Sequence, residues 1–519
     1  MTATTAPTPP VPTATQSANH VRVAIVGTGF AGLGAAIALQ REGVEHTILE
    51  RADDVGGTWR DNRYPGCRCD VPSHLYSFSF APNPDWSETY SPQPEIFAYL
   101  RRTAEEHGVI ERIRFGHEVR EARWDAAAQR WAIDTAAGPM TADVLILGNG
   151  PLAEPAIPDL PGLDTFEGTT FHSATWRHDH DLAGERVAVI GTGASAIQFV
   201  PEIQPVVGHL TLFQRTPPWV LPHRNRRISP AERALYRRVP AAQRAVRSMV
   251  YWSRELFGTS LLRNAKSLDG LERMARKQLH EQVPDAELRA RLTPDYKPGC
   301  KRLLLSNDYF PALGQPNVDV ANEKIVGVRP HAVVTADGVE HAVDTIIFGT
   351  GFHVTDNPVA NRLRGVGGTT LADRWASTGA QAYLGTTVPG FPNLFLLAGP
   401  NTGIGHTSLV VMIEAQLAYI TDALRLMDET GAASVDVRPT TFAAWSEEIQ
   451  AKAAGTVWNS GGCASWYLDA EGRNTTLWPD HTYKFRARTR RFDASSYELT
   501  APPVPTETTV PTTTTGGAR

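Results

Sequence analysis

The stretch VAIVGTGFAG, residues 23–32, decides the fold of this chain. An apolar run leads into a tight glycine turn, and the small residues after the turn begin a helix. Such a turn presents backbone N–H groups and the positive end of a helix dipole to a pyrophosphate. The next apolar strand, TIL at residues 47–49, ends at Glu50. Glu50 stands roughly 20 residues beyond the turn, where an acid accepts hydrogen bonds from a free ribose 2′-OH.

A second copy of this pattern, VAVIGTGASA, occupies residues 187–196. It has Ala196 where the third glycine would stand, a change that affects only helix–strand packing. The charged residue after its next strand is the base Arg215, which favours a ribose 2′-phosphate. One such turn alone is weak evidence, since glycines also serve ordinary turns. Two turns with oppositely charged partners predict two dinucleotides, one of which carries a ribose 2′-phosphate. They suggest a flavoenzyme that NADPH reduces.

Length and composition are those of a multidomain globular enzyme. The chain has 519 residues, of which 42% are hydrophobic and 20% charged, and roughly two to four domains are expected. Its net charge of −5 gives no electrostatic reason to expect nucleic acid or an anionic membrane as a partner. No stretch approaches the ~18 consecutive apolar residues of a membrane helix. Residues 1–20 and 496–519 are rich in Thr and Pro and are predicted to be disordered tails.

The cysteines indicate a reducing compartment. There are four, Cys67, Cys69, Cys300 and Cys463, and no CxxC. They are expected to be reduced thiols in a cytoplasmic protein, and the start of the chain lacks the apolar core of a secretory signal. The lack of a suitable pair argues against a disulfide reductase, which needs redox-active cysteines beside its flavin. No Cys/His spacing suggests a metal site.

The order of the remaining segments predicts one domain interrupted by another. DVLILGNG at residues 143–150 and DTIIFGTG at residues 344–351 are predicted buried parallel strands that end in glycine turns. Residues 229–296, rich in Arg, Glu, Ala and Leu, are expected to form several amphipathic helices inserted in the NADPH domain. NLFLLAGP at residues 393–400 is expected to return to the flavin domain.

These patterns predict an α/β fold with two Rossmann-like domains, for FAD and NADPH, the second inserted in the first and carrying the helical insert. The predicted FAD domain comprises residues 21–160 and 386–495, and the predicted NADPH domain comprises residues 161–385.

Two segments carry a resemblance to a known family. FEGTTFHSATW at residues 166–176 matches the pattern FxGxxxHxxxW, and residues 57–70, from GTW through YPG to Asp70, are similar to GxWxxxxYPGxxxD. In these segments, and around Lys301-Arg302, the chain resembles the flavin-dependent Baeyer–Villiger monooxygenases over roughly residues 21–485. Trp176 distinguishes it from related N- and S-oxidising enzymes, which usually carry Tyr or Phe there. The chain departs from the family at Arg177, where Pro or Asp is usual.

The resemblance implies an enzyme that uses FAD, NADPH and O2 to insert oxygen beside a ketone, giving an ester or lactone. Reduced flavin captures O2 as a C4a-peroxide, which attacks the carbonyl. A fixed cation then stabilises the developing negative charge, and exclusion of water prevents loss of hydrogen peroxide. Arg302 matches the active-site arginine of the family, and such a group stays charged and presents a fork of donors. Asp70 matches the carboxylate that positions it near the flavin.

The predicted cofactor-binding residues fall in four groups. Those of the first turn and its partner acid are Gly27, Gly29, Phe30, Gly32 and Glu50. Those expected near the flavin or its nucleotide are Gly57, Thr58, Trp59, Arg68, Cys69, Asp70, Tyr76 and Val119. Those of the second turn are Gly191, Thr192, Gly193, Ala194, Ser195, Ala196 and Gln198. The last group is Arg215, Thr216, Lys301, Arg302 and Trp458, of which Arg215, Thr216 and Lys301 are expected to hold the 2′-phosphate.

Three further residues have a structural alternative to a functional role, or no assigned role. A general-base role for His172 is disfavoured, because the resemblance places it in a linker that governs domain motion. Trp458 is expected in a mobile loop that closes over the nicotinamide, or else as an exposed tryptophan at a partner interface. His406 resembles a segment near the flavin and is assigned no role. Two alternatives stay open for the whole chain: an S- or N-oxygenating flavin monooxygenase, and a non-catalytic NADP(H)-responsive binding protein.

Overall fold

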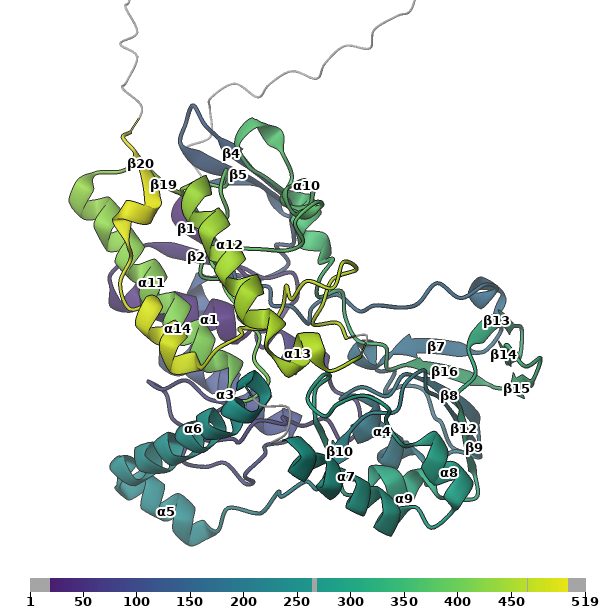
Figure 1. Ribbon diagram of the computed structural model, residues 1–519. Helices are drawn as coiled ribbons and strands as arrows, with labels where there is room; N and C mark the ends of the chain where they lie inside the picture. Colours follow the sequence, from purple (N-terminus) through teal and green to yellow (C-terminus); the bar gives the residue numbers. More distant parts are fainter. Residues whose placement is uncertain (1–18, 264–267, 464, 503–519) are drawn as a thin grey trace, which may run out of the picture.

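Two α/β units lie side by side in this protein, and helices inserted in the second reach back to the first (Figure 1). The computed structural model describes residues 19–263, 268–463 and 465–502. Of the predicted disordered tails, residues 1–18 and 503–519 lie outside the described residues.

The first unit is built on an eight-stranded sheet. Its order is β17-β4-β5-β6-β1-β2-β3, and β18 pairs with the end of β6. The strands β2, β1, β6 and β18 are parallel, so their carboxyl ends share one edge. The strands are β1 (His20–Val26), β2 (His46–Leu49), β3 (Ile113–Arg114), β4 (Val119–Asp125), β5 (Arg130–Thr135), β6 (Gly138–Leu147), β17 (Leu363–Arg364) and β18 (Leu394–Leu396).

Helices cover the first sheet. Helix α1 (Phe30–Arg41) connects β1 to β2, and the largely buried α11 (Leu409–Thr430) packs beside it. The other helices of this unit are α2 (Thr58–Asp61), α3 (Gln93–Glu106), α10 (Leu371–Trp375), α12 (Pro439–Ala454), α13 (Val457–Ser460) and α14 (Thr482–Arg488). Short 3-10 turns lie at Ile110–Arg112, Pro358–Arg362, Val366–Gly368 and Ala494–Ser496.

The second unit is built on a five-stranded parallel sheet of order β12-β9-β8-β16-β7. Its strands are β7 (Thr169–His172), β8 (Arg186–Ile190), β9 (His209–Phe213), β12 (Val318–Ala321) and β16 (Thr345–Phe348). The helices α4 (Ala196–Ile203) and α9 (Tyr309–Leu313), the pair β10 (Val220–Leu221) and β11 (Leu304–Leu305), and the antiparallel β13 (Ile325–Arg329), β14 (Ala332–Thr335) and β15 (Glu340–Ala342) complete it. Its 3-10 turns are Leu163–Thr165 and Ser173–Thr175. The predicted fold class, two Rossmann-like units with the second inserted in the first, is confirmed.

The predicted helical insert is confirmed as well. It consists of α5 (Pro230–Arg238), α6 (Pro240–Arg263), α7 (Asp269–Gln282) and α8 (Ala286–Arg291). Ser229 begins α5 through a capping box with Glu232, which satisfies two free backbone donors. Helix α6 lies against the first unit, where Arg247 Nη1 donates to the carbonyl oxygens of His74 (2.8 Å) and Ser77 (2.9 Å). The insert therefore bridges the two units.

Two predicted boundaries differ from the observed fold. The chain returns to the first sheet before residue 386, because β17 pairs with β4 at Leu363 and Arg364. The C-terminal tail begins later than residue 496, because β20 (Tyr497–Thr500) pairs with β19 (Ser434–Val437). Tyr497 is fully buried and its hydroxyl bonds to Thr387 and Tyr419. Long-range packing of this kind outweighs the polar composition around it.

The expectation of four reduced cysteines is wrong for two of them. Cys300 and Cys463 form a disulfide with their Cα atoms 6.1 Å apart, whereas Cys67 and Cys69 are free and buried. The two bonded residues are 163 positions apart in the sequence. Their proximity is a product of the tertiary fold, so spacing could not predict it.

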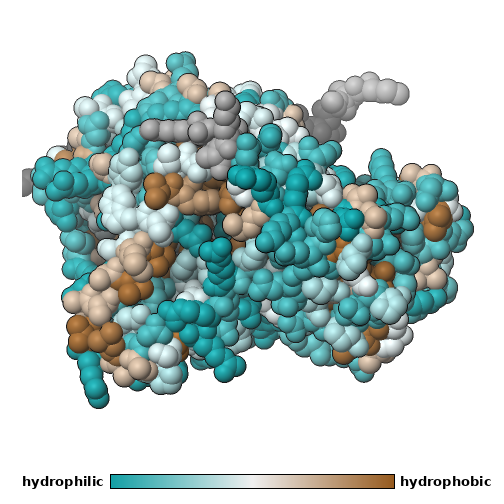
Figure 2. All heavy atoms as spheres, turned by 60° about the horizontal axis from the view of Figure 1, so that its bottom comes forward, coloured by the Kyte–Doolittle hydropathy of each residue, from teal (hydrophilic) through white to brown (hydrophobic). Residues whose placement is uncertain are grey.

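The surface is mostly hydrophilic on the face where the insert and the second unit come forward, with scattered hydrophobic groups (Figure 2). Its larger exposed apolar residues include Met249, Trp252 and Leu256 on α6. Among the described residues, every helix is too short or too polar to span a membrane.

Candidate active site

The first glycine turn lies at the carboxyl edge of the first sheet, between β1 and α1. A Cβ atom on Gly32 would lie 1.8 Å from the carbonyl oxygen of Gly27, so only glycine allows the helix to approach the turn this closely. Helix α1 begins at Phe30, and within the described chain no side chain caps its Gly29 terminus. Its first N–H groups therefore point outward without a side-chain acceptor, as a pyrophosphate site requires.

Glu50 is held rigidly at the end of β2, beside this turn. One carboxylate oxygen accepts hydrogen bonds from the Thr28 backbone N–H (3.0 Å) and hydroxyl (2.5 Å). The other accepts from the Ala52 N–H (3.0 Å) and lies 3.0 Å from Arg60 Nη1. The spacing of the sequence located Glu50, but Thr28 and Arg60, which fix it, were not predicted. A ribose contact by Glu50 stays a prediction.

The second glycine turn, between β8 and α4, has the same form. Gly191 has a φ of +112°, and the turn lies against the end of β16. Helix α4 begins at Ala196, and its Ser195 terminus lacks a side-chain cap among the described residues. Thr192 donates its hydroxyl to the carbonyl oxygen of Thr216 (3.2 Å), which joins this turn to the segment after β9.

Two cations meet beside this second turn. Arg215 is exposed directly after β9 and the neighbouring Gln214. Burial lowers the pKa of Lys301, and Arg215 lowers it further because the two charges repel. Within the described ranges neither cation forms an ion pair with a carboxylate. Asp295 acts on Lys301 in the opposite sense, but two adjacent cations suit a doubly charged anion.

Gln198, predicted as a cofactor contact, joins the two units in this structure. Its side chain accepts hydrogen bonds from the Tyr64 hydroxyl (3.0 Å) and the Arg68 N–H (3.2 Å), and it donates to the Arg68 carbonyl (3.2 Å). Arg68 itself pairs with Glu88 at 3.2 Å. The loop that carries Asp70 is thereby attached to helix α4 of the second unit.

Asp70 and Arg302 form an ion pair between the two units. Arg302 Nε donates to Asp70 Oδ2 at 2.5 Å and Arg302 Nη2 to Asp70 Oδ1 at 2.7 Å, a bidentate geometry. Their side chains are 32% and 26% exposed. Burial alone raises the pKa of Asp70, but Arg302 outweighs it and the resulting pKa is lowered. The pair is therefore intact above the usual carboxyl pKa and is lost only as the pH falls through the lowered value.

Aromatic side chains lie beside this ion pair. The Trp59 indole donates to the Tyr76 hydroxyl (3.0 Å), and the Phe30 ring lies 5.0 Å from the Tyr76 ring. Burial raises the pKa of Tyr76, and Asp70 and Arg302 lie close enough to act on it as well. Burial also raises the pKa of Tyr467 to about 12, against the opposing effect of neighbouring Arg302. The result is a charged fork in a largely apolar, aromatic setting.

Comparison with known proteins gives the same assignment. Residues 20–361 match the family model described as flavin-binding monooxygenase-like. A Baeyer–Villiger monooxygenase of Streptomyces coelicolor is 53% identical over 485 residues, 93% of each chain. One of Pseudomonas aeruginosa is 48% identical, over 96% of this chain and 94% of its own. The chain belongs to the Baeyer–Villiger monooxygenases. A solved structure of OTEMO in complex with FAD and NADP superposes with a TM-score of 0.83 at 28% identity, over 92% of this chain and 99% of its own.

In this Baeyer–Villiger monooxygenase the segment at residues 166–176 is structural. A Cβ on Gly168 would lie 2.1 Å from the carbonyl oxygen of Asp344, so the glycine lets β7 pass close to β16. His172 Nδ1 accepts the N–H of Ala174 (3.1 Å), and the Trp176 ring lies 5.3 Å from the Phe199 ring of α4. The segment thus packs inside the second unit. The expectations that His172 governs domain motion and has no direct chemical role stay predictions.

The buried side chain of His172 is expected to make the stability of the second unit sensitive to acid. Burial lowers its pKa from 6.5 to about 4, so the folded state resists a proton that the unfolded chain accepts. The contribution of the neutral, buried His172 to the free energy of unfolding is complete above pH 6.5. It is lost as the pH falls toward 4, and the free energy of unfolding drops by about 3 kcal/mol in all. We expect His172→Gln, which cannot titrate, to flatten the pH dependence of the urea unfolding midpoint between pH 7.5 and 5. Equal slopes for the variant and the wild-type enzyme would contradict this role.

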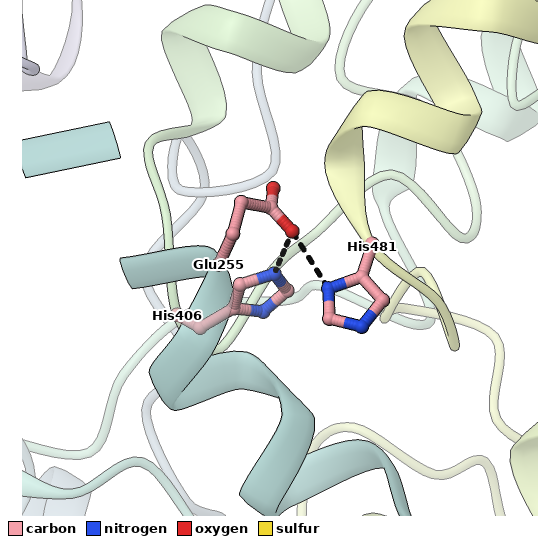
Figure 3. A group of neighbouring side chains, drawn as sticks. All are labelled: Glu255, His406 and His481. Carbon is pink, nitrogen blue, oxygen red and sulfur yellow. Dashed lines mark hydrogen bonds and ion pairs between the residues drawn. The ribbon is translucent and has the colours of Figure 1, made fainter. Parts of the chain in front are cut away.

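A buried cluster lies behind the ion pair. Glu255 of α6, His406 of the loop before α11 and His481 at the start of α14 point toward one another (Figure 3). His481 Nδ1 lies 2.8 Å and His406 Nε2 3.7 Å from Glu255 Oε2, while Thr482 donates its N–H and hydroxyl to Oε1. Burial raises the pKa of Glu255, but His406, Thr482 and His481 outweigh it and lower the pKa to about 2.

This cluster holds the insert against the active-site loop. The ligand-type atoms of its three residues lie within 4.8 Å of one another. Hydrogen bonds from Thr482 and His481 already occupy the Glu255 carboxylate, so we interpret the cluster as a buried polar network. Ile404, two residues before His406, offers its carbonyl oxygen to Arg302 Nη1 at 3.4 Å. Through this loop α6 supports the position of the arginine. No sequence pattern predicts this network, since its members come from three distant segments.

The structure shows the surroundings of three other residues that were predicted as cofactor contacts. Trp458 is 1% exposed in α13 and packs against Gly405, so the exposed-interface alternative is wrong. Cys69 is buried, and its N–H donates to the Ser91 carbonyl oxygen (3.1 Å). Val119 begins β4, and its carbonyl oxygen accepts from Arg362 (3.0 Å). Cofactor contacts by these residues stay predictions.

Proposed function

We propose that this Baeyer–Villiger monooxygenase binds FAD at the first glycine turn and NADPH at the second, and uses O2 to convert a ketone into an ester or lactone. The observation that carries the proposal is the bidentate pair of Arg302 and Asp70, which lies at the junction of the two units beside the aromatic side chains. We also propose a cytoplasmic location, where NADPH is available.

The chain fits both nucleotides. Two uncapped helix starts, at Phe30 and Ala196, offer N–H groups to two pyrophosphates. The acid Glu50 beside the first turn suits a ribose hydroxyl, and the cations Arg215 and Lys301 beside the second suit a 2′-phosphate. FAD, when bound, supplies the chemistry that activates O2, and NADPH supplies its electrons.

The residues of the chain then orient the ketone and stabilise charge. Arg302 stays protonated because Asp70 raises its pKa, and its guanidinium donates to the ketone oxygen as negative charge develops there. Asp70 holds two of its donors in place. The side chains of Trp59, Tyr76 and Tyr467 exclude water, which strengthens this interaction.

The proposal is tested on the purified enzyme. Purified enzyme is expected to be yellow, to bleach with NADPH without oxygen, and to recover its colour when air is admitted. Incubation with cyclic, linear, aryl and steroid ketones should give esters or lactones that contain one atom of ¹⁸O from ¹⁸O2. Oxidation of sulfides or amines without conversion of any ketone would contradict the proposal, and so would a colourless protein that does not consume NADPH.

Arg215 is expected to select the phosphorylated coenzyme. In Arg215→Ala, the KM for NADPH should rise by about 10- to 100-fold, because a charge-assisted hydrogen bond contributes about 1.5–3 kcal/mol. The KM for NADH, which lacks the 2′-phosphate, should change little. Steady-state kinetics with both coenzymes measure this difference.

The matched control is Arg273→Ala. Arg273 is exposed on α7, and among the described residues its side chain bonds to a carbonyl oxygen of its own helix, at Asp269, so both KM values should stay as in the wild-type enzyme. A parallel rise in the two KM values of Arg215→Ala would show that Arg215 does not read the phosphate.

A further inference from the structure

The disulfide between Cys300 and Cys463 joins the two units beside the active site. Cys300 precedes Arg302 by two residues and belongs to the second unit, whereas Cys463 follows α13 of the first unit. The cross-link therefore ties the segment that carries the ion-paired arginine to the segment after Trp458.

Apolar packing surrounds the disulfide. Before Cys463, Val457 and Trp458 pack in an apolar cluster with Leu261 of α6. Among the described residues, the stretch from Gly461 to Cys463 meets the segment that carries Arg302 through the disulfide, through packing on Cys300, and through a backbone hydrogen bond from Lys297 N–H to the Gly461 oxygen (3.0 Å). After it, Trp466 is 49% exposed. The disulfide is the covalent link that adds to this packing.

The two sulfur atoms differ in accessibility. Cys300 is 1% exposed, whereas Cys463 is half-buried next to the exposed Gly462. A thiol reagent can therefore reach the Cys463 sulfur first. In a reducing compartment, cross-links of this kind are usually transient and redox-sensing.

We propose that Cys300 and Cys463 are a reversible oxidation site whose disulfide clamps the residues from Val457 to Cys463 to the segment that carries Arg302 and slows coenzyme exchange. Hydrogen peroxide, which a flavin monooxygenase releases when reduced flavin meets O2 without productive oxygenation, is the oxidant. Two thiols and one H2O2 give the disulfide and two water molecules, and each sulfur loses one proton and one electron. In the reverse step a dithiol transfers two electrons and two protons to the pair and becomes a disulfide itself. The kinetic consequence rests on the proposed function, but the cross-link does not.

The first experiment detects the bond in the full-length holoenzyme. The enzyme is treated with either H2O2 or dithiothreitol, alkylated, and mapped by mass spectrometry without reduction. A linked pair of peptides containing Cys300 and Cys463 should appear after peroxide and vanish after dithiothreitol. Cys67 is the internal control, because burial raises its pKa to about 12 and it should stay a thiol under both treatments. No linked peptides after peroxide would overturn the proposal.

The second experiment measures the clamp without relying on turnover. Reduction should speed chymotryptic cleavage after Trp466 at least 5-fold, and should raise the rate of NADP+ dissociation by a similar factor. Cys463→Ser should behave as the reduced enzyme in both assays and should not respond to dithiothreitol. If the bond forms but both rates are the same in either state, the clamp is refuted. A cleavage difference in an enzyme that converts no ketone would preserve the clamp and refute the proposed function instead.

Discussion

Replacing Arg302 by alanine is expected to lower kcat for ketone oxygenation by about 10²–10³-fold, the usual loss when one donor to a developing oxyanion is removed. Arg302 is the cation at the junction of the units, and its fork is oriented by two hydrogen bonds to Asp70. The variant should still bind FAD, since Glu50 and the first glycine turn lie outside this pair. NADPH oxidation in air should therefore continue, with the electrons appearing as hydrogen peroxide. The measurement is the ratio of ester formed to NADPH consumed.

The matched control for this variant is Arg177→Ala. Arg177 departs from the usual residue of the family, yet within the part of the chain that the structure describes its guanidinium bonds to the nearby Asp179 alone, at 3.0 and 2.8 Å, on the surface. Exposed pairs of this kind contribute little, so ester yield and kcat should stay within about 2-fold of the wild-type enzyme. Undiminished ester formation by Arg302→Ala would refute the role assigned to Arg302.

The glycine turns and their charged partners could be predicted because their requirements are local. A helix start that approaches a turn to within van der Waals distance demands Gly32, and a charge at a fixed offset follows from the length of one βα unit. The helical insert was predictable from apolar periodicity for the same reason. The boundaries of the two units were harder to predict, because β17 and β20 are short strands held by pairing partners far away in the sequence.

The surroundings of Arg302 could not be predicted from the chain alone. Asp70 and Arg302 were paired through family resemblance, and their separation of 232 positions in the sequence follows no spacing rule that would pair them. Ile404 and Tyr467, which also lie next to Arg302, come from two further segments. The disulfide and the Glu255 cluster likewise bring together residues from segments that are far apart in the sequence. Each depends on how the insert and the C-terminal segments pack on the first unit, which is a tertiary property.

Asp70→Ala is expected to lower kcat for ketone oxygenation by about 10²-fold, although Asp70 need not touch the ketone. Without its carboxylate, Arg302 loses both of its short hydrogen bonds and keeps the long contact to the Ile404 oxygen at 3.4 Å and the neighbouring Tyr467, so the guanidinium loses its fixed orientation. A misplacement of about 1 Å in a catalytic group can cost that much. Asp70→Asn retains one oxygen acceptor but no charge, and it should show an intermediate loss. Product formation under saturating NADPH and ketone measures all three enzymes.

The double variant Asp70→Ala/Arg302→Ala separates positioning from independent action. If Asp70 acts by orienting Arg302, its removal has nothing left to disturb once the arginine is gone, and the double variant should be as slow as Arg302→Ala alone. Additive losses would instead mean that the Asp70 carboxylate contributes to the reaction by another route. The lowered pKa of Asp70 supports the first outcome, because a carboxylate ionised at every working pH has no proton to exchange and acts on its surroundings as a fixed charge.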